Sequence, residues 1–273
     1  MFRAVFTRRI LGAIAFAIVF GIACFLLGEW QLSRYEAKDA RASAVEANYG
    51  AAAVPLADVL PSPTSALPEQ KAWSKVTVTG RYAGEHSYLV RGRTLSSSVG
   101  IEVLVPLVVQ TPSGPATLMV DRGWVRLSDS AATIPDYPGA PTGEITVSGW
   151  LKPGEDDRGR DLPKGQLASV DLETVRAELG GAVYAAYLVL DHETTPSGST
   201  PLRPTPLEAP SVDRGPHFAY ALQWWLTALL GVAFVVYLYR SRPGAAAARE
   251  TKASDGRQTD KAKKVRIWDE EDG

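Results

Sequence analysis

The chain contains very little cysteine, little histidine and almost no net charge. Its 273 residues include one cysteine, Cys24, and three histidines, and the charged side chains leave a formal net charge of −1. A single cysteine excludes an internal disulfide, so a packed core has to hold the fold together. A nearly neutral chain has no strong positive field to attract nucleic acid, and we therefore do not expect nucleic acid as a partner.

Motifs of catalysis are also scarce. No serine or cysteine has a general base at a familiar spacing, and no glycine-rich turn between a strand and a helix indicates a phosphate site. The segment DHE at Asp191–Glu193 could suggest a metal, but neighbouring residues on a strand point to opposite faces. We predict that the chain is not an enzyme and has no catalytic residues. A membrane-tethered enzyme with its site in the central domain is the less favoured alternative.

Two long apolar runs, one near each end, dominate what is present. Residues 10–27 read ILGAIAFAIVFGIACFLL, and residues 218–239 form a second run without a charged side chain. At a rise of about 1.5 Å per residue, both runs can cross a hydrocarbon core of roughly 30 Å as α-helices. The first run matches signal-cleavage and lipid-attachment patterns poorly, so we expect it to stay in place as an anchor.

Basic side chains flank both runs. Arg3, Arg8 and Arg9 precede the first run, and Arg240 and Arg242 follow the second. Positive charge marks the cytoplasmic side of a membrane helix, so we expect both termini in the cytoplasm and the central domain outside. Because no long presequence precedes the first run, a bacterial plasma membrane is the expected location of this two-span protein.

The remaining sequence divides by composition. Proline and alanine are concentrated after the first helix, and mixed charges are concentrated at the C-terminal end. The predicted segments are a cytoplasmic N-terminus (1–9), a first transmembrane helix (10–27), its helical extension (28–49), a Pro/Ala linker (50–72), a β-rich exported domain with loops (73–217), a second transmembrane helix (218–239) and a disordered cytoplasmic charged tail (240–273).

The central domain has the alternation of apolar and polar residues that is typical of strands. KVTVTGRY at residues 75–82 is the first such run, four others follow, and AYLVLDH is a late sixth. One short helix is expected at DLETVRAELGG, with Asp171 as its N-cap and Gly180 or Gly181 as its C-cap. The predicted fold class is an α+β membrane protein. Its two terminal transmembrane helices flank a mostly antiparallel β domain, a small sheet or partly closed barrel, with one short helix.

Two local patterns have plain structural interpretations. VDRGWV at residues 120–125 predicts the end of a strand, with a surface ion pair between Asp121 and Arg122 and a core tryptophan at Trp124. His86, in GEHSY, is expected to be an exposed turn residue.

The second apolar run begins with an imidazole, at His217 in HFAYALQWW. At 100° per residue, His217, Ala221, Trp224 and Ala228 share one face of a helix, with Tyr220 and Gly231 beside it. A stripe of small residues at Ala13, Ala17 and Gly21 suggests that the two runs pack through small faces. His217 itself has two possible roles, a ligand or a polar group at a helix end.

Three motifs, in this order around the two runs, resemble the surfeit locus protein 1 family. They are GEWQLSRYEAK after the first run, RGWV in the middle and HFAYALQWW opening the second, and the resemblance extends over residues 10–239. Members of this family are assembly factors for haem–copper cytochrome c oxidase. The resemblance implies a chaperone in the bilayer that binds the catalytic subunit of the oxidase, works with other oxidase assembly factors, and assists haem a insertion at the outer leaflet. A scaffold that binds no haem is the alternative.

The resemblance also implies roles for individual residues. Its first motif is matched by Gly28, Trp30, Gln31, Arg34 and Lys38. The histidine that opens the second span is the family's proposed haem contact, so His217 is the candidate axial ligand of a transiently bound haem a, whose iron is the only metal expected. The candidates for stacking on the haem or for contacting its propionates are Trp224, Tyr220, Arg34, Lys38 and Arg214.

Overall fold

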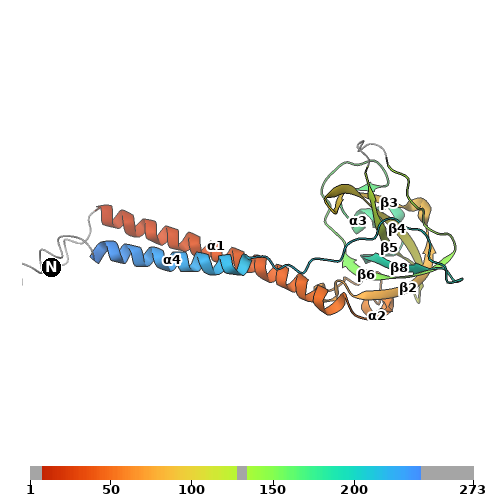
Figure 1. Cartoon of the computed structure of the whole chain (residues 1–273), viewed down its shortest axis with the longest axis horizontal. Coiled ribbons are helices and arrows are strands. Elements are labelled where there is room, and N and C mark those ends of the chain that lie inside the picture. The colour runs from red at the N-terminus through yellow and green to blue at the C-terminus, as the bar shows by residue number, and fades with distance from the viewer. Residues whose placement is uncertain (1–7, 128–133, 241–273) are drawn as a thin grey trace, which may run out of the picture. The chain divides into compact units, whose positions relative to one another are not determined.

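A computed structural model describes residues 8–127 and 134–240 of the chain (Figure 1). Residues 1–7 and 241–273, and with them most of the predicted cytoplasmic N-terminus and charged tail, lie outside the described residues. The described chain separates into two compact units. We call residues 8–36 and 215–240 the helical unit, and residues 37–214 the β unit.

The helical unit consists of the first part of α1 (Arg8–Asn48) and all of α4 (His217–Arg240). No proline interrupts either helix, and the two helices lie side by side (Figure 1). Only 11% of the most apolar 18-residue stretch of α1, and 6% of that of α4, is buried. The apolar side chains of both helices therefore face outward. Among the described residues, these two helices are long and apolar enough to cross a membrane, which is compatible with a two-span membrane protein.

The β unit begins with the last turns of α1 and continues through short helices and strands. The helices are α2 (Leu56–Val59), the 3₁₀ turns η1 (Glu69–Lys71) and η2 (Gly84–His86), and α3 (Leu172–Leu179). The strands are β1 (Val54–Pro55), β2 (Lys75–Tyr82), β3 (Tyr88–Leu95), β4 (Ser98–Thr111), β5 (Gly114–Arg126), β6 (Glu144–Pro153), β7 (Gln166–Leu167) and β8 (Val183–Thr194).

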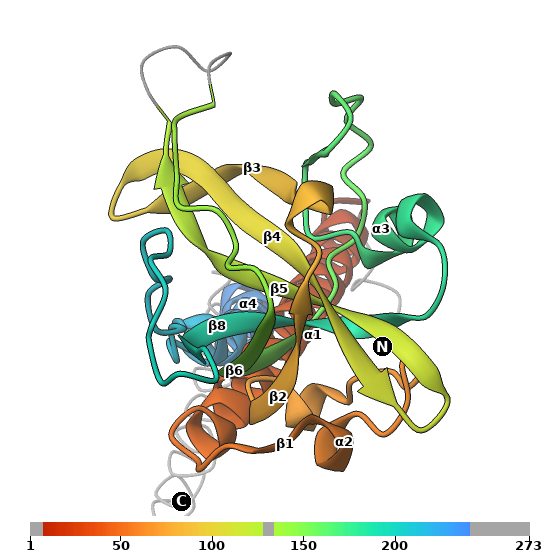
Figure 2. The same ribbon diagram turned by 90° about the vertical axis from the view of Figure 1, so that its right-hand side faces the viewer.

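Five of these strands close into a barrel (Figure 2). The order β2–β6–β8–β5–β4 returns to β2 because the end of β2 pairs with β4 at Arg81↔Val108 and Tyr82↔Leu107. Along the edge opposite β5, the long strand β4 pairs with β3 in its first half and with β2 in its second half. Most pairs are antiparallel, but β5 and β8 run parallel. A barrel leaves few open strand edges, which limits unwanted pairing with other chains.

Two apolar cores stabilise this barrel. The interior is filled by alternate side chains of the barrel strands, among them Leu118, Val147 and Leu188, each fully buried. On the outer face of β5 and β8, α3 covers a second core that includes Met119 and Val175. The alternation predicted from the sequence therefore assigns each strand one face inside the barrel and, for β5 and β8, another face under α3.

The helix α3 has the predicted caps. The Asp171 carboxylate accepts hydrogen bonds from the backbone N–H groups of Glu173, at 2.9 Å, and Thr174, at 3.3 Å. Gly180 ends the helix with a φ of 70°, a left-handed conformation that glycine adopts at little cost. Two terminal apolar helices and a mostly antiparallel β domain with the short helix α3 therefore confirm the predicted α+β fold class.

The C-terminal end of α1 is fastened to the barrel by polar and aromatic contacts. The Tyr49 ring stacks on Trp150 of β6 with ring centroids 4.4 Å apart, and the Trp150 indole donates to the Tyr49 carbonyl oxygen at 2.9 Å. The Asn48 amide donates to the carbonyl oxygens of Gln70, at 2.7 Å, and Ala72, at 2.9 Å. These bonds satisfy the end of the helix and fix its last turns against β6 within the β unit.

Candidate functional site

His217 is the first residue of α4 and contacts α1. Its Nδ1 lies 2.9 Å from the side-chain Oε1 of Gln31, within the helical unit. Gly215, with a φ of 65°, and Pro216 precede the helix, and the Pro216 carbonyl accepts the Tyr220 N–H at 3.1 Å. The glycine turns the chain into the helix and the proline begins the first turn, which places the imidazole half-buried against α1.

Small residues line the contact between α1 and α4. On α1 the least exposed positions recur at intervals of three or four residues, and on α4 Ala221 is fully buried. The α1 stripe consists of Ala17, Gly21, Cys24, Gly28, Gln31 and Tyr35. It overlaps the predicted small-residue stripe at Ala17 and Gly21, but Ala13 is exposed because the contact extends toward the C-terminal end of α1. Small side chains let two helix backbones approach closely.

Gly28 is a point of close contact between the two helices. A Cβ atom at this position would lie 2.2 Å from Nε1 of Trp225, so only glycine leaves room for the indole. Trp225 Nε1 is buried and has no hydrogen-bond partner among the described residues. The neighbouring Trp224, which the sequence favoured for stacking, is half-buried on the same helix. The sequence QWW at residues 223–225 indicates that an indole lies at this contact. Only the packing shows that Trp225, and not Trp224, occupies the space at Gly28.

Aromatic side chains continue this contact on the other side of Gln31. The rings of Tyr35 and Phe218 are tilted at 46° with centroids 5.4 Å apart. Tyr220, a predicted stacking residue, is 47% exposed. Tyr35 was not singled out from the sequence, although its position seven residues after Gly28 places both on one face of α1.

The three basic candidates have different surroundings. Arg34 is exposed on α1 within the helical unit, whereas Lys38 and Arg214 belong to the β unit. The Arg214 guanidinium donates to Asp39 at 2.5 Å and to both carboxylate oxygens of Glu46 at 3.0 Å. Arg214 thus connects the segment before α4 to the extension of α1, and both carboxylates compete with any propionate for it.

The segment RGWV closes one end of the barrel, and it differs here from the sequence prediction. Arg122 does not form a surface ion pair with Asp121, because it points into the barrel and is fully buried against Glu193 of β8. Its Nη2 donates to Glu193 Oε1 at 2.5 Å and its Nε to Oε2 at 3.3 Å. Tyr82 of β2 donates to the same carboxylate at 2.9 Å. Burial and the charge of Glu193 raise the pKa of Tyr82, which keeps this hydroxyl protonated.

The same arginine holds two loops over the barrel end. Arg122 Nη1 donates to the Pro138 carbonyl at 3.3 Å, and Nη2 donates to the Leu202 carbonyl at 3.1 Å. Gly123, with a φ of 136°, brings the backbone next to Thr205, where a Cβ atom would lie 2.5 Å from the carbonyl oxygen. Trp124 is a core residue, as predicted, and its backbone pairs with Thr205 in both directions. The motif therefore has a structural role in the β unit.

Asp121 is buried on the opposite side of β5 in a cluster of charged groups. Its Oδ1 accepts the Gly123 N–H at 3.1 Å, while its Oδ2 is buried without a hydrogen-bond partner. The charged groups that act on it are Glu102 of β4, Arg93 of β3 and Lys152 of β6. Burial, followed by the charge of Glu102, raises the pKa of Asp121 well above its ordinary value.

The other members of this cluster pair with one another. Arg93 donates to Glu155 at 2.7 Å, and its Nε lies 2.9 Å from Glu102 in an ion pair that lacks hydrogen-bond geometry. Lys152 lies over the Tyr187 ring of β8 at 5.3 Å from its centroid. Burial by itself raises the pKa of Glu155, but its hydrogen bond and ion pair with Arg93, together with the Val170 N–H and the charge of Lys152, lower the pKa overall. Both glutamates pair with Arg93, whereas no ion pair among the described residues reaches the Asp121 carboxyl group.

We expect Asp121 to make the β unit less stable as the pH rises. Its pKa is raised in the folded state above 3.8, so the folded protein binds a proton that the unfolded chain releases. The stabilisation that this bound proton gives the folded state is complete below pH 3.8, and it is lost as the pH rises through the pKa of Asp121 in the folded protein. Asp121→Asn, which keeps an acceptor for Gly123, should therefore be more stable than wild type at neutral pH and equal to it near pH 3.8. Unfolding by denaturant across this range measures the difference, and an identical pH slope in both proteins would contradict it.

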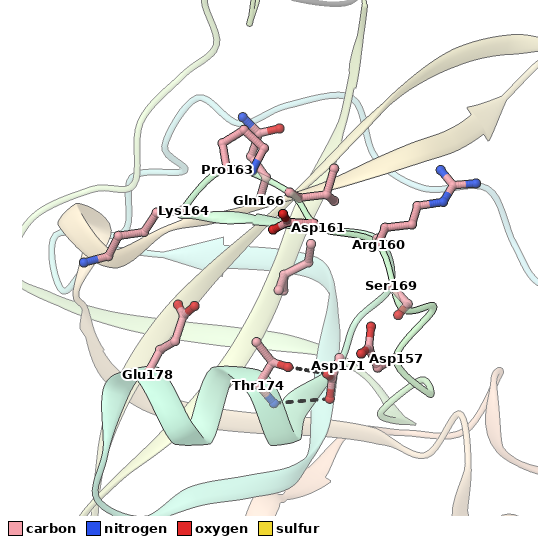
Figure 3. A pocket seen from close by; sticks show the side chains of 13 residues that line it. Asp157, Arg160, Asp161, Pro163, Lys164, Gln166, Ser169, Asp171, Thr174 and Glu178 are labelled. Atoms are coloured by element: carbon pink, nitrogen blue, oxygen red, sulfur yellow. Dashed lines mark hydrogen bonds between the residues drawn. The ribbon is translucent and has the colours of Figure 1, made fainter.

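A cavity of about 180 Å³ lies between α3 and the loop before it (Figure 3). Thr174 and Glu178 extend from α3 toward the loop that carries Asp161 and Lys164. The Asp171 carboxylate at its edge is already used for capping. Within residues 8–127 and 134–240, no three side chains of His, Cys, Asp or Glu are grouped to hold a metal ion. The cavity therefore offers a mixed-charge surface without the ligands of a metal centre.

Comparison with known proteins identifies a family for this chain. The chain matches the family described as SURF1 family over residues 18–229, a range that includes most of both long helices and the entire barrel. It is similar to uncharacterized SURF1-like proteins of Mycobacterium bovis and of two strains of Mycobacterium tuberculosis. Each is 30% identical over 235 residues, which cover 82% of this chain and 83% of the relative. The chain therefore belongs to the SURF1 family, a family of assembly factors for cytochrome c oxidase and not of enzymes.

Proposed function

We propose that this protein is a membrane chaperone that binds the catalytic subunit of cytochrome c oxidase and assists the insertion of haem a. The observation that carries the proposal is the environment of His217. Its Nδ1 is engaged by Gln31 and its ring is half-buried, at the start of a helix whose remaining side chains are almost entirely apolar. An imidazole with one nitrogen held by the protein is the usual arrangement of a histidine that binds a metal.

The residues around His217 suit a flat, apolar ligand with a central metal. Bound haem would supply an iron that accepts one imidazole nitrogen and a wide ring that favours apolar surroundings. His217 would hold the iron, and Trp224, Tyr220 and Phe218 offer ring faces on the same end of α4. The buried N–H of Trp225, which has no partner within the described part of the chain, is a donor for a polar group of the ligand. Arg34, exposed on α1, is the basic candidate for a propionate within the helical unit.

The proposal includes a location and an orientation. We place both spans in a bacterial plasma membrane, with both termini in the cytoplasm and the β unit outside, because Arg8, Arg9 and Arg240 flank the spans. In this orientation His217 lies at the outer surface of the bilayer. There the protein would contact the catalytic subunit and other oxidase assembly factors. A reporter enzyme that is active only outside the cytoplasm should work when fused near Pro163 and stay silent when fused after Arg242. The reverse result would overturn the orientation.

Substitution of His217 tests the proposed haem site. The protein purified from cells that make haem a should show a Soret band that scales with protein, and His217→Ala should remove or shift this band. Membrane insertion and abundance should stay normal, because one imidazole contributes little to holding an apolar helix in lipid. Cells carrying His217→Ala should also assemble less oxidase, measured from the haem a absorbance of their membranes.

The two other histidines of the chain provide matched controls. His86 lies in the exposed turn η2, and His192 is exposed on β8, so His86→Ala and His192→Ala should leave the Soret band unchanged. If His217→Ala keeps both its haem bands and normal oxidase, the imidazole is only a polar group at a helix end. A scaffold that holds the subunit without binding haem would then be the better description.

A further inference from the structure

Gln31 and His217 form the one side-chain hydrogen bond described between the two long helices of the helical unit. The distance between Nδ1 and Oε1 is 2.9 Å, which is a normal hydrogen bond. A glutamine carbonyl oxygen can only accept, so the imidazole must donate through Nδ1. A neutral imidazole carries one ring proton. With that proton on Nδ1, the other nitrogen, Nε2, presents a free lone pair.

Close packing on both sides holds this hydrogen bond in place. Toward the N-terminus of α1, Gly28 receives Trp225, and no larger residue fits there without moving the indole. Toward its C-terminus, Tyr35 packs on Phe218. Gln31 lies between these two contacts on the same face of α1, so a slip of the helices along one another would break all three together. The position of the Gln31 amide therefore follows from the packing of the pair.

A glutamine at this place has a chemical consequence for His217. In metal-binding proteins the ligating histidine usually donates its second N–H to an oxygen acceptor, which fixes the ring orientation and makes the other nitrogen more basic. Gln31 Oε1 is such an acceptor. An Nε2 lone pair without a partner in a half-buried, apolar setting costs free energy, so binding a metal or a hydrogen-bond donor stabilises it.

We propose that Gln31 is a positioning residue that holds His217 in the Nδ1–H tautomer and so presents Nε2 for coordination to iron. The tautomer follows from the hydrogen bond between Gln31 and His217 in the protein alone. Only the identity of the metal, iron, rests on the proposed function. Gln31 belongs to the membrane-border motif GEWQLSRYEAK, and the proposal gives this polar residue a role that the aromatic and basic residues of the motif do not perform.

The tautomer can be read directly in the protein without a ligand. The full chain, labelled with ¹⁵N-histidine and carrying His86→Ala and His192→Ala, contains one histidine and gives one pair of ring nitrogen signals in lipid nanodiscs. At alkaline pH we expect a protonated Nδ1 and an unprotonated Nε2. Gln31→Met, which keeps the length but removes the acceptor, should shift the proton toward Nε2. Gln31→Glu, which keeps an oxygen acceptor, should retain it on Nδ1. Protonated Nε2 in the wild type, or the same signals in Gln31→Met, would overturn the proposal.

Titration with hemin separates this role from the proposed function. If the wild type binds hemin, Gln31→Met should weaken binding by about 10- to 100-fold, the usual effect of losing such a partner, and Gln31→Glu should restore most of it. Gln223→Met, on the exposed face of α4, is the matched control and should bind as wild type. Equal binding by Gln31→Met and wild type would contradict the positioning role. If the wild type binds no hemin while its tautomer is as expected, the proposed haem function fails and the tautomer assignment stands.

Discussion

Replacing Glu193 with alanine is expected to lower the free energy of unfolding of the β unit by about 3–5 kcal/mol. Arg122 and Glu193 are both fully buried, and the substitution leaves the guanidinium charge inside the barrel without its partner. Tyr82 loses its acceptor at the same time. Hydrogen exchange of the full chain in detergent should show the loss, because the protection of β5 and β8 should fall roughly a hundredfold to several thousandfold at about 1.4 kcal/mol per factor of ten.

An exposed ion pair provides the matched control for this experiment. Glu173 and Arg176 on α3 pair at 2.6 Å, but the glutamate side chain is 83% exposed, so Glu173→Ala should cost no more than about 0.5 kcal/mol. The double variant Arg122→Met with Glu193→Leu removes both charges and should be less destabilised than Glu193→Ala alone. Equal protection in Glu193→Ala and Glu173→Ala would show that the buried pair does not hold the barrel end.

Gly28→Ala is expected to separate the two long helices where Trp225 packs on Gly28. The new methyl group would lie 2.2 Å from Nε1 and 2.5 Å from Cδ1 of Trp225, so the indole or the helix has to move. Overpacking of this kind costs about 1–3 kcal/mol. Tyr35→Cys and Phe218→Cys, in a Cys24→Ala background, place two thiols where the rings now touch, 5.4 Å between centroids. The yield of thiol cross-linking should fall several-fold when Gly28→Ala is added.

Gly21, in the same helix, is the control. It shows whether the overlap with Trp225 or any glycine-to-alanine change in α1 lowers the cross-linking yield. A Cβ atom on Gly21 meets nothing within 4 Å, so Gly21→Ala should keep the cross-linking yield of the parent protein. Trp225→Ala added to Gly28→Ala makes room for the methyl group and should recover part of the yield. If Gly28→Ala cross-links as well as Gly21→Ala does, the packing of Trp225 on Gly28 does not set the distance between the helices.

Local patterns were sufficient for the general architecture. An uncharged run long enough to span a bilayer, such as residues 10–27, forms a helix whatever its neighbours are, because every backbone group is satisfied within the segment. Strand alternation at residues 75–82 and the caps of α3 at Asp171 and Gly180 are also properties of short segments. The motifs at the membrane borders, taken in order, indicated the family that the comparisons show.

The partners of buried charges could not be predicted in this way. Arg122 was expected to face its neighbour in sequence, Asp121, at the surface, yet the two side chains leave β5 on opposite sides. Its real partner, Glu193, is 71 residues away and becomes adjacent only because β5 and β8 pair side by side. Nothing in the spacing of the strands indicated that these two run parallel or that β2 would return to β4 and close the barrel.

The amino-acid sequence by itself determined the two long helices, α3, the six longer strands in their order along the chain, and the imidazole at the start of α4, because each depends on hydrophobic period, turn residues or caps within a short segment. The tertiary structure alone decided that Trp225 occupies the space at Gly28, that Gln31 meets His217, and that Arg122 is neutralised by Glu193. These pairs join residues far apart in the chain. Their formation depends on how two helices or several strands pack, and the energy of that packing is spread over many contacts that no local pattern records.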